Sequence, residues 1–172
     1  MKIISDLSIT LVDALSGWGL RECTSKYPGI QVPADVSQRT ILGMEIVLRH
    51  VPQLIARILI AEPLAPTDPR GAFRAQFGPE DVDNLLLHDG RQLADYPIDE
   101  DVRRRVETPD FSPVVCTVQV AKDDPGYFIG KFVIFDGWHR AAAWLIRTSQ
   151  GHSQRLTADV IRTIHPLIHP TA

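Results

Sequence analysis

The segment around Gly137 combines residue types that bind phosphate. Asp136 stands where a helix N-cap is expected, so Gly137, Trp138 and His139 are expected in the first helical turn. The backbone N–H groups of a first turn have no intrahelical partners and carry the positive end of the helix dipole. Gly137 allows a ligand to approach the backbone closely, and His139 and Arg140 supply donors suited to phosphate oxygens. The segment therefore predicts a phosphate-binding site.

Each of these residues also has an ordinary structural explanation. Asp136 can simply cap the helix, which is worth ~1 kcal/mol. Trp138 can be a core aromatic, and Arg140 can pair with a surface acid. For any one residue the ordinary explanation is preferred, because short motifs match by chance. The combination at a strand-to-helix junction favours the functional interpretation, and Asp136 can cap a helix and still bind a metal or a water molecule.

The C-terminal third of the chain supplies the elements that would position this turn. Alternating apolar residues predict a strand over 114–120, and a second strand is predicted over 128–135. A helix is predicted from Asp136 to near Gly151, and a last strand at about 156–164. The candidate site would therefore lie between a strand and the helix that follows it.

Helices and loops are predicted for the rest of the chain. Apolar residues at helical spacing predict a helix over 1–17 and a second one over 36–51, with an irregular stretch over 18–35. The acids after Pro79 predict a short helix that ends at Gly90. We expect an α+β protein with a small mixed sheet flanked by helices. Its expected divisions are an N-terminal helical segment packed on the core (1–53), a central domain (54–165) and a C-terminal tail (166–172).

Composition and charge limit the possible functions. The 172 residues carry a formal net charge of −3, so any contact with DNA must depend on a local basic patch. Cys23 and Cys116 form no metal-ligand spacing and are expected to be buried thiols of a reducing compartment. No segment predicts a signal peptide or a transmembrane span, so we expect a soluble, cytoplasmic protein.

The turn resembles the signature of the ParB/sulfiredoxin superfamily. Members carry a strand, a Gly-x-His/Arg-Arg turn and a helix that begins with small residues, which here are Ala141 to Ala143. The segment from Pro66 to Arg70 is similar to the Pro-Arg loop of ParB-like domains, and 156–164 matches the strand after the motif helix. The resemblance covers about residues 55–165 and implies a ParB/sulfiredoxin-like domain. Stand-alone members include ATP or CTP hydrolases, small-molecule kinases and DNases.

Two departures narrow what this resemblance implies. Trp138 stands where sulfiredoxins place a reactive cysteine, so repair of sulfinic acids is not expected. His139 stands where chromosome-partitioning ParB proteins have a second arginine, and no helix-turn-helix domain follows the last strand. Recognition of a centromere-type DNA sequence is therefore not expected either.

Five residues are candidates for the chemistry if the reaction is phosphate hydrolysis. Arg140 would stabilise charge on the cleaved phosphate, and His139 would donate to a second oxygen. Asp136 would position Mg²⁺ or the attacking water. Glu62 matches the catalytic glutamate of related small-molecule kinases, unless it is a solvated loop acid. Arg70 would reach a phosphate across the cleft, or would only pin its own proline-rich loop.

Two further clusters have weaker functional interpretations. The run Arg103–Arg105 could follow a DNA backbone, but its acidic neighbours favour a solvated helix face whose charges pair with each other. His165 and His169 are four residues apart with His152 nearby, yet the intervening prolines prevent helical alignment. We therefore expect a terminal tail there and not a metal site.

The expected activity is nucleotide hydrolysis, with ATP as the substrate or ligand and Mg²⁺ or another divalent cation as the cofactor, together with DNase activity. The resemblance implies DNA and the conjugation or type IV secretion machinery as partners, as in plasmid-encoded inhibitors of conjugative or T-DNA transfer. Two alternatives remain open. One is a non-catalytic nucleotide-binding switch or partner-binding module, and the other is a small-molecule kinase.

Overall fold

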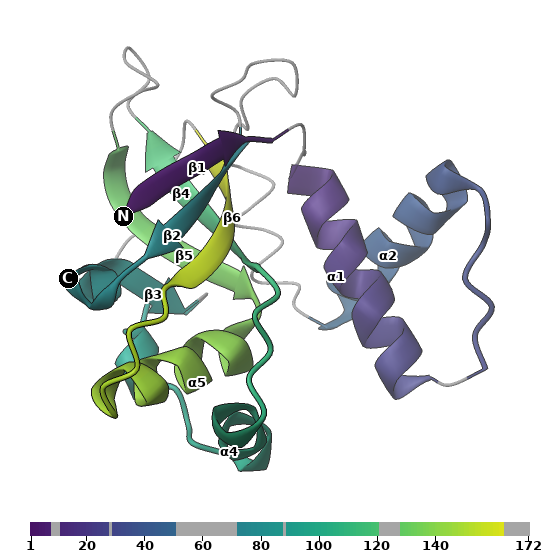
Figure 1. Ribbon diagram of the computed structural model, residues 1–172. Coiled ribbons are helices and arrows are strands. Elements are labelled where there is room, and N and C mark those ends of the chain that lie inside the picture. Colours follow the sequence, from purple (N-terminus) through teal and green to yellow (C-terminus); the bar gives the residue numbers. More distant parts are fainter. Residues whose placement is uncertain (8–10, 28, 51–71, 88, 121–127, 164–172) are drawn as a thin grey trace.

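The computed structural model describes residues 1–7, 11–27, 29–50, 72–87, 89–120 and 128–163, and it is built around a six-stranded mixed sheet (Figure 1). The strand order is β1-β2-β6-β4-β5-β3. β6 pairs parallel with β4, and β3 pairs parallel with β5, whereas the other neighbours are antiparallel. The strands are β1 (Lys2–Asp6), β2 (Ala72–Phe77), β3 (Leu85–Leu87), β4 (Val114–Val120), β5 (Phe128–Asp136) and β6 (Leu156–Thr163).

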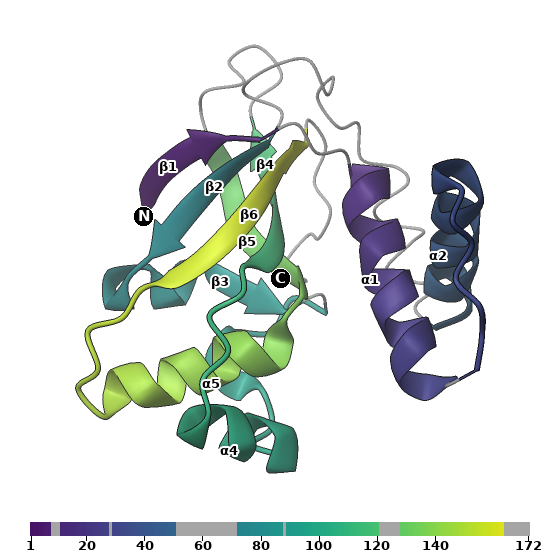
Figure 2. The same cartoon turned by 45° about the vertical axis from the view of Figure 1, so that its right-hand side comes forward.

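Two groups of helices flank this sheet. In both views α5 lies along the sheet with α4 beyond it, whereas α1 and α2 form a separate pair (Figures 1 and 2). The described helices are α1 (Leu11–Lys26), α2 (Val36–His50), α4 (Glu100–Glu107) and α5 (Trp138–Ser149), with short 3₁₀ helices η1 (Pro79–Asn84) and η2 (Leu93–Asp95). The combination of a mixed sheet with flanking helices confirms the expected mixture of α and β structure.

The two faces of the sheet bury different helices. Successive residues of a strand point to opposite faces, and β5 shows the consequence. Ile134 belongs to the core that contains Trp144 of α5. Its neighbour Phe135 belongs to a second core with Leu15 and Trp18 of α1. The N-terminal helices therefore pack on the opposite face from α5, and the turn after β5 lies between the two layers.

The α1–α2 pair is held by a close backbone crossing. A Cβ placed on Gly19 would lie 2.0 Å from the carbonyl oxygen of Gly43. A Cβ placed on Gly43 would lie 2.3 Å from the carbonyl oxygen of Ser16. Real Cβ atoms do not approach so closely, so the crossing requires glycine at both positions. This contact fixes the position of α1 and of the side chains that α1 presents to the sheet.

The first 35 residues depart from the sequence prediction. Lys2–Asp6 forms the edge strand β1, paired with β2, where a helix over 1–17 was expected. Residues 18–26 were expected to be irregular, but α1 continues through Gly17 to Lys26. The apolar spacing of this region fits a helix from Leu11 onward, while β2 offers a free edge to Lys2–Asp6. Gly17 costs a helix about 1 kcal/mol, which the packing of Leu15 and Trp18 outweighs.

The segment after Pro79 also differs from its prediction. The expected helix ending at Gly90 is replaced by the 3₁₀ helix η1 and then by β3. Leu85, Leu86 and Leu87 are all buried, and they pair in parallel with Phe132–Ile134 of β5. Three consecutive apolar residues have no periodicity that distinguishes a buried strand from a helix. Pairing with β5 therefore determines that Leu85–Leu87 forms a strand.

Within the described residues, no helix has both the length and the apolar character needed to cross a membrane.

Candidate functional site

The turn between β5 and α5 depends on a left-handed glycine. Gly137 has a φ of 90° and is the N-cap residue of α5. A Cβ at this position would lie 2.8 Å from both Val114 Cγ1 and Arg140 Nη2. The expectation that Asp136 caps α5 is therefore wrong, because Asp136 is the last residue of β5. The first helical turn begins at Trp138, one residue later than predicted.

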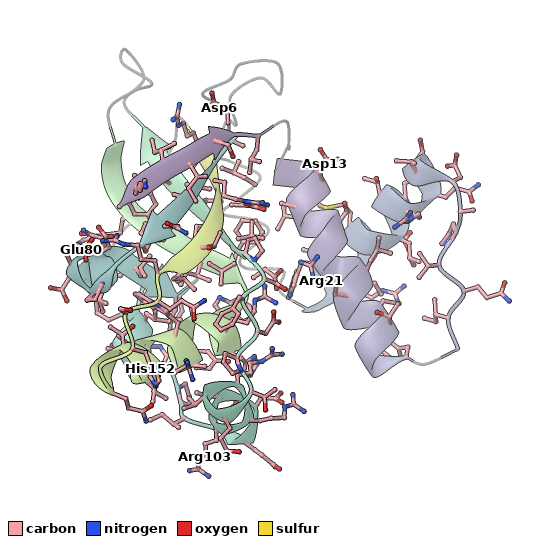
Figure 3. All side chains as sticks on the ribbon, viewed as in Figure 1. Asp6, Asp13, Arg21, Glu80, Arg103 and His152 are labelled. Atoms are coloured by element: carbon pink, nitrogen blue, oxygen red, sulfur yellow. The ribbon has the colours of Figure 1, made fainter. Side chains whose placement is uncertain are left out.

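A cleft of about 230 Å³ opens at this turn. It is lined by residues from α1, α4, the end of β5 and the start of α5, namely Trp18, Arg21, Arg105, Asp136, Gly137, Trp138, His139 and Arg140. Figure 3 shows Arg21 extending from α1 toward the sheet. The structure thus brings together all five residues of the predicted turn, and it adds two arginines from elsewhere in the chain.

Asp136 is an ion-pair partner within the cleft. Its side chain is 12% exposed, and its Oδ2 accepts a hydrogen bond from Arg21 Nη2. Arg140 Nη2 lies 3.8 Å from the same oxygen. Two guanidinium groups therefore neutralise this carboxylate, which makes Asp136 a weak candidate for a general base.

The donors in the described part of the cleft do not form a resident Mg²⁺ site. Mg²⁺ requires several oxygen ligands in a near-octahedral arrangement. Asp136 is the one carboxylate among the cleft-lining residues, and its Oδ2 accepts from Arg21. Across the described residues there is no group of three or more His, Cys, Asp or Glu side chains placed to hold a metal ion. The hydrogen bond from Arg21 therefore occupies the one oxygen donor, Asp136 Oδ2, that pairs within this part of the cleft.

Arg140 forms part of the cleft wall. Its Nη2 donates to the Pro113 carbonyl at 3.1 Å, and its Nη1 lies 3.8 Å from Asp110 Oδ2. Arg105 Nη1 reaches the same Asp110 oxygen at 3.3 Å. Hydrogen bonds from Ser112, followed by the charges of both arginines, lower the pKa of Asp110. Arg140 is consequently fixed in place, with only 16% of its side chain exposed.

His139 connects α5 to α4. Its Nε2 lies 3.3 Å from Asp99 Oδ2 and 3.3 Å from the Tyr96 hydroxyl. Asp99 also caps α4, because its Oδ1 accepts from the Val102 N–H at 2.9 Å. That backbone hydrogen bond, and then His139, lower the pKa of Asp99. The imidazole therefore has a fixed position at the rim of the cleft.

Trp138 combines a structural role with a place in the cleft. Its Nε1 donates to the Ile134 carbonyl at 2.8 Å. Its ring meets Trp18 of α1 edge to face, with 6.2 Å between the ring centroids. The core-aromatic explanation of Trp138 is thus compatible with its contribution to the cleft wall.

Sequence reasoning missed Arg21 and Arg105. Arg21 lies 115 residues before Asp136, and no local pattern in the sequence indicates that they meet. Arg105 belongs to the run that was expected to be a solvated, self-paired face. Arg104 fits that expectation because it forms an ion pair with Asp101 on the same helix. Arg105 instead pairs with Asp110, which lies outside the helix, and it lines the cleft. The only signal for it was the concentration of arginine in the run.

The other predicted residues divide into two groups. Glu62, Arg70, His165 and His169 lie outside the described residues, so their predicted roles remain predictions. Cys23 and Cys116 are buried and free, as expected, and burial raises the pKa of the Cys116 thiol. His152 is described and is exposed.

Comparison of the chain with protein-family models, with curated proteins and with solved structures found no match.

Proposed function

We propose that the chain is a nucleotide hydrolase of the ParB/sulfiredoxin fold that binds the phosphates of ATP in the cleft at the start of α5. The observation that carries this proposal is the convergence of Arg21, Arg105 and Arg140 from three different helices on one cleft. Guanidinium groups are well suited to phosphate because they remain charged and donate in a planar fork.

The charge of the cleft favours an anionic ligand. Among the described residues, three arginines and one aspartate, Asp136, line it, and Asp110 pairs with two of these arginines, although the whole chain is formally negative at −3. The first-turn N–H groups of α5 add the positive end of a helix dipole at the same place. Positive charge is thus concentrated where a phosphate group would bind, which supports the proposal.

Arg21 is the most adaptable contact in this proposal. Its side chain is 56% exposed, whereas that of Arg140 is 16% exposed. A phosphate oxygen can therefore replace Asp136 as the acceptor of the Arg21 donor without disturbing the packed core. Arg140 would add fixed positive charge for the transition state, and His139 would donate to a second oxygen.

The substrate class follows from the same chemistry. A cleft that stabilises charge on a phosphate group can act on the anhydride of ATP and on the phosphodiester of DNA. Mg²⁺ or another divalent cation would enter with the nucleotide as part of the substrate and would neutralise phosphate oxygens. Glu62, as the expected catalytic carboxylate, remains part of the proposal.

The biological setting is proposed from the sequence resemblance alone. Among single proteins, the chain resembles the plasmid fertility-inhibition protein Osa, the oncogenic suppression factor. That resemblance implies ATPase and DNase activity directed against transferred DNA in the cytoplasm, with the conjugation or type IV secretion machinery as a partner. The turn from Asp136 to Arg140 is the segment that carries it.

One observation favours a second candidate, a nucleotide-binding switch without turnover. The carboxylate of Asp136 is occupied by Arg21, so the described cleft residues offer no unpaired carboxylate to activate water. A switch needs only the arginines and the helix N-terminus. A small-molecule kinase, the remaining alternative, additionally requires an acceptor site beside the phosphates.

Activity assays of purified protein with Mg²⁺ test the proposal. We expect release of phosphate from ATP and degradation of DNA by the wild type. Arg140→Ala should lower both rates about 10²-fold or more, the cost of removing a donor that stabilises transition-state charge. Arg91→Ala is the matched control, because Arg91 forms an exposed ion pair with Asp89 outside the cleft.

Folding and binding must be separated in this comparison. Arg140 is largely buried, so circular dichroism should establish that Arg140→Ala is folded, and Arg21→Ala serves as a second variant at a more exposed position. ATP binding without turnover would favour the switch. Wild-type rates in both Arg140→Ala and Arg21→Ala would place the active site elsewhere.

A further inference from the structure

His139 is held against α4 by one of its two ring nitrogens. Its Nε2 lies 3.3 Å from Asp99 Oδ2 and 3.3 Å from the Tyr96 hydroxyl. The Tyr96 ring also meets the imidazole edge to face, with 5.5 Å between the ring centroids. The orientation of the imidazole is therefore set by groups beside the cleft, while His139 itself lines the cleft.

Asp99 is a well-anchored partner for this histidine. Its Oδ1 accepts a hydrogen bond from the Val102 N–H at 2.9 Å, because Asp99 is the N-cap of α4. Its other oxygen, Oδ2, faces His139. The two helices are also packed together, since Val102 of α4 is buried in one core cluster with Ala142 and Ala143 of α5. The packing of α4 on α5 therefore fixes the carboxylate and the imidazole relative to each other.

The contact with Asp99 determines which nitrogen of the neutral imidazole carries the proton. The Val102 N–H, and then His139, lower the pKa of Asp99, so its carboxyl is ionised at neutral pH. An ionised carboxylate only accepts hydrogen bonds, so Nε2 must hold the proton that Asp99 accepts. The Tyr96 hydroxyl competes as a donor to Nε2, but a hydrogen bond to a charged acceptor is about twice as strong as a neutral one. The neutral ring therefore has its proton on Nε2 and its lone pair on Nδ1.

Nδ1 is the ring nitrogen nearer to the main chain of α5. In the imidazole ring it is bonded to the carbon that carries Cβ, whereas Nε2 lies at the far side of the ring. His139 belongs to the first turn of α5, just after Gly137, and 35% of its side chain is exposed. Since Nε2 is engaged with α4, Nδ1 is left on the side of the first-turn N–H groups, where the proposed phosphate would bind.

We propose that His139 is the general base of the hydrolase and that Asp99 is its positioning residue, an inference that rests on the proposed function. Nδ1 accepts a proton from water while the water oxygen bonds to the terminal phosphorus of ATP and the bond from that phosphorus to the ADP oxygen breaks. The imidazolium then donates through Nδ1 to a phosphate oxygen, and its proton passes to solvent as the products leave. A histidine thus supplies the base that Asp136, occupied by Arg21, does not.

The pH dependence of turnover follows from the groups that surround His139. Tyr96 and Asp99 contact its ring, and burial, followed by the charges of Asp99 and Asp101, raises the pKa of Tyr96, so the phenol stays neutral. The other ionisable residues that line the cleft are Arg21 from α1, Arg105 from α4, Asp136 from β5 and Arg140 from α5. Guanidinium and carboxylate groups keep their charge near neutral pH, whereas histidine titrates there. Turnover should therefore fall as acid protonates the imidazole, and this acid limb should be absent in His139→Gln.

Steady-state hydrolysis of ATP with Mg²⁺ tests the roles of both residues. His139→Gln keeps a hydrogen-bonding side chain but has no basic nitrogen, so it should lower kcat about 10²-fold or more. Asp99→Asn keeps an oxygen to cap α4, but its amide donates to Nε2 and so moves the ring proton to Nδ1. It should lower kcat about tenfold or more without raising KM, because it also removes a negative charge near the nucleotide. Asp101→Asn is the matched control, since Asp101 pairs with the exposed Arg104, and it should keep the wild-type kcat.

Nitrogen NMR of the neutral His139 ring provides a readout that needs no nucleotide. We expect the proton on Nε2 in the wild type and on Nδ1 in Asp99→Asn, and the same spectra show whether the variant is folded. A wild-type ring protonated on Nδ1, or the same tautomer in both proteins, would overturn the role of Asp99.

The kinetic outcomes separate this inference from the proposed function. Wild-type kcat in His139→Gln, with ATP hydrolysis intact, would place the base elsewhere and refute this inference alone. Absence of ATP hydrolysis by the wild type would refute the hydrolase and its general base together.

Discussion

Gly137 determines how the chain passes from β5 into α5. Its φ of 90° lies in the region that side chains disfavour, and Val114 and Arg140 occupy the space that a Cβ would need. We expect Gly137→Ala to lower the free energy of unfolding by about 2–4 kcal/mol, the sum of backbone strain and steric overlap. Chemical denaturation provides the measurement.

A substitution at Gly151 separates the backbone strain from the steric overlap. Gly151 has nearly the same φ, 91°, but a Cβ placed there would meet no atom within 4 Å. Gly151→Ala should therefore lose only about 1–2 kcal/mol, the cost of the left-handed backbone. Equal losses in the two variants would mean that contact with Val114 and Arg140 does not constrain the turn.

Part of the candidate site could be predicted from the sequence because that part is local. Gly137, His139 and Arg140 are close in the chain, and a glycine at a strand-to-helix junction is a local signal. Arg21 and Arg105 come to the cleft through tertiary packing, which no spacing in a single sequence encodes. The N-cap of α5 was predicted one residue too early, at Asp136, because glycine can itself occupy an N-cap position.

At the scale of elements, the α1–α2 crossing controls the position of Arg21. Gly43→Ala would place a methyl group 2.3 Å from the Ser16 carbonyl, a backbone atom that cannot move independently. We expect the two helices to separate and the free energy of unfolding to fall by about 1–3 kcal/mol. Denaturation followed by tryptophan fluorescence would measure the loss.

Gly17→Ala is the matched control on α1. A Cβ there meets only Arg21 Nη1, at an ordinary 3.5 Å. Since alanine is the better helix former, the substitution should stabilise the protein by up to about 1 kcal/mol. The two substitutions are therefore expected to have opposite signs, and destabilisation of similar size by both would contradict the close crossing.

An element could be predicted when residues close to it in the sequence determine its conformation. β4, β5 and β6 were all predicted as strands, and β4 was predicted from the alternation of its apolar residues. The end of α5 was predicted from Gly151, which has a φ of 91°. β1 and β3 were missed because their conformations depend on pairing with β2 and β5, partners far away in the sequence.

At the scale of the whole molecule, acid should lower the stability of the protein as Asp99 and Asp110 are protonated. The pKa of each carboxyl lies below its usual 3.8 in the folded state. Their contribution to stability is therefore complete above the unfolded pKa and is lost as the pH falls through the lower folded values. We expect the thermal midpoint to decrease below about pH 4.

Asp110→Asn isolates one part of this acid response. The variant should be less stable than the wild type at neutral pH, because Arg105 and Arg140 lose a charged partner. The difference should shrink as the pH falls below about 4, where the wild-type carboxyl also becomes neutral. Asp95→Asn, at an exposed position on η2, is the control. A difference that stays constant with pH would contradict the role given to Asp110.

The proposed binding of an anion by a chain with a net charge of −3 depends on the local arrangement of charge. Fields near a surface are set by the local arrangement of charges more than by the total, and here three arginines surround one helix N-terminus. The affinity for ATP should accordingly fall as salt screens the cleft.

Titration of ATP into the wild type and into Arg21→Ala tests the central claim most directly. The Arg21 side chain is 56% exposed, so its loss removes little packed surface, and Arg21 belongs to the cleft through the tertiary fold alone. We predict that the wild type binds ATP and that Arg21→Ala binds it about tenfold or more weakly, while Arg91→Ala binds like the wild type. Absence of ATP binding by the wild type, or equal affinity in Arg21→Ala, would contradict a phosphate site at the start of α5.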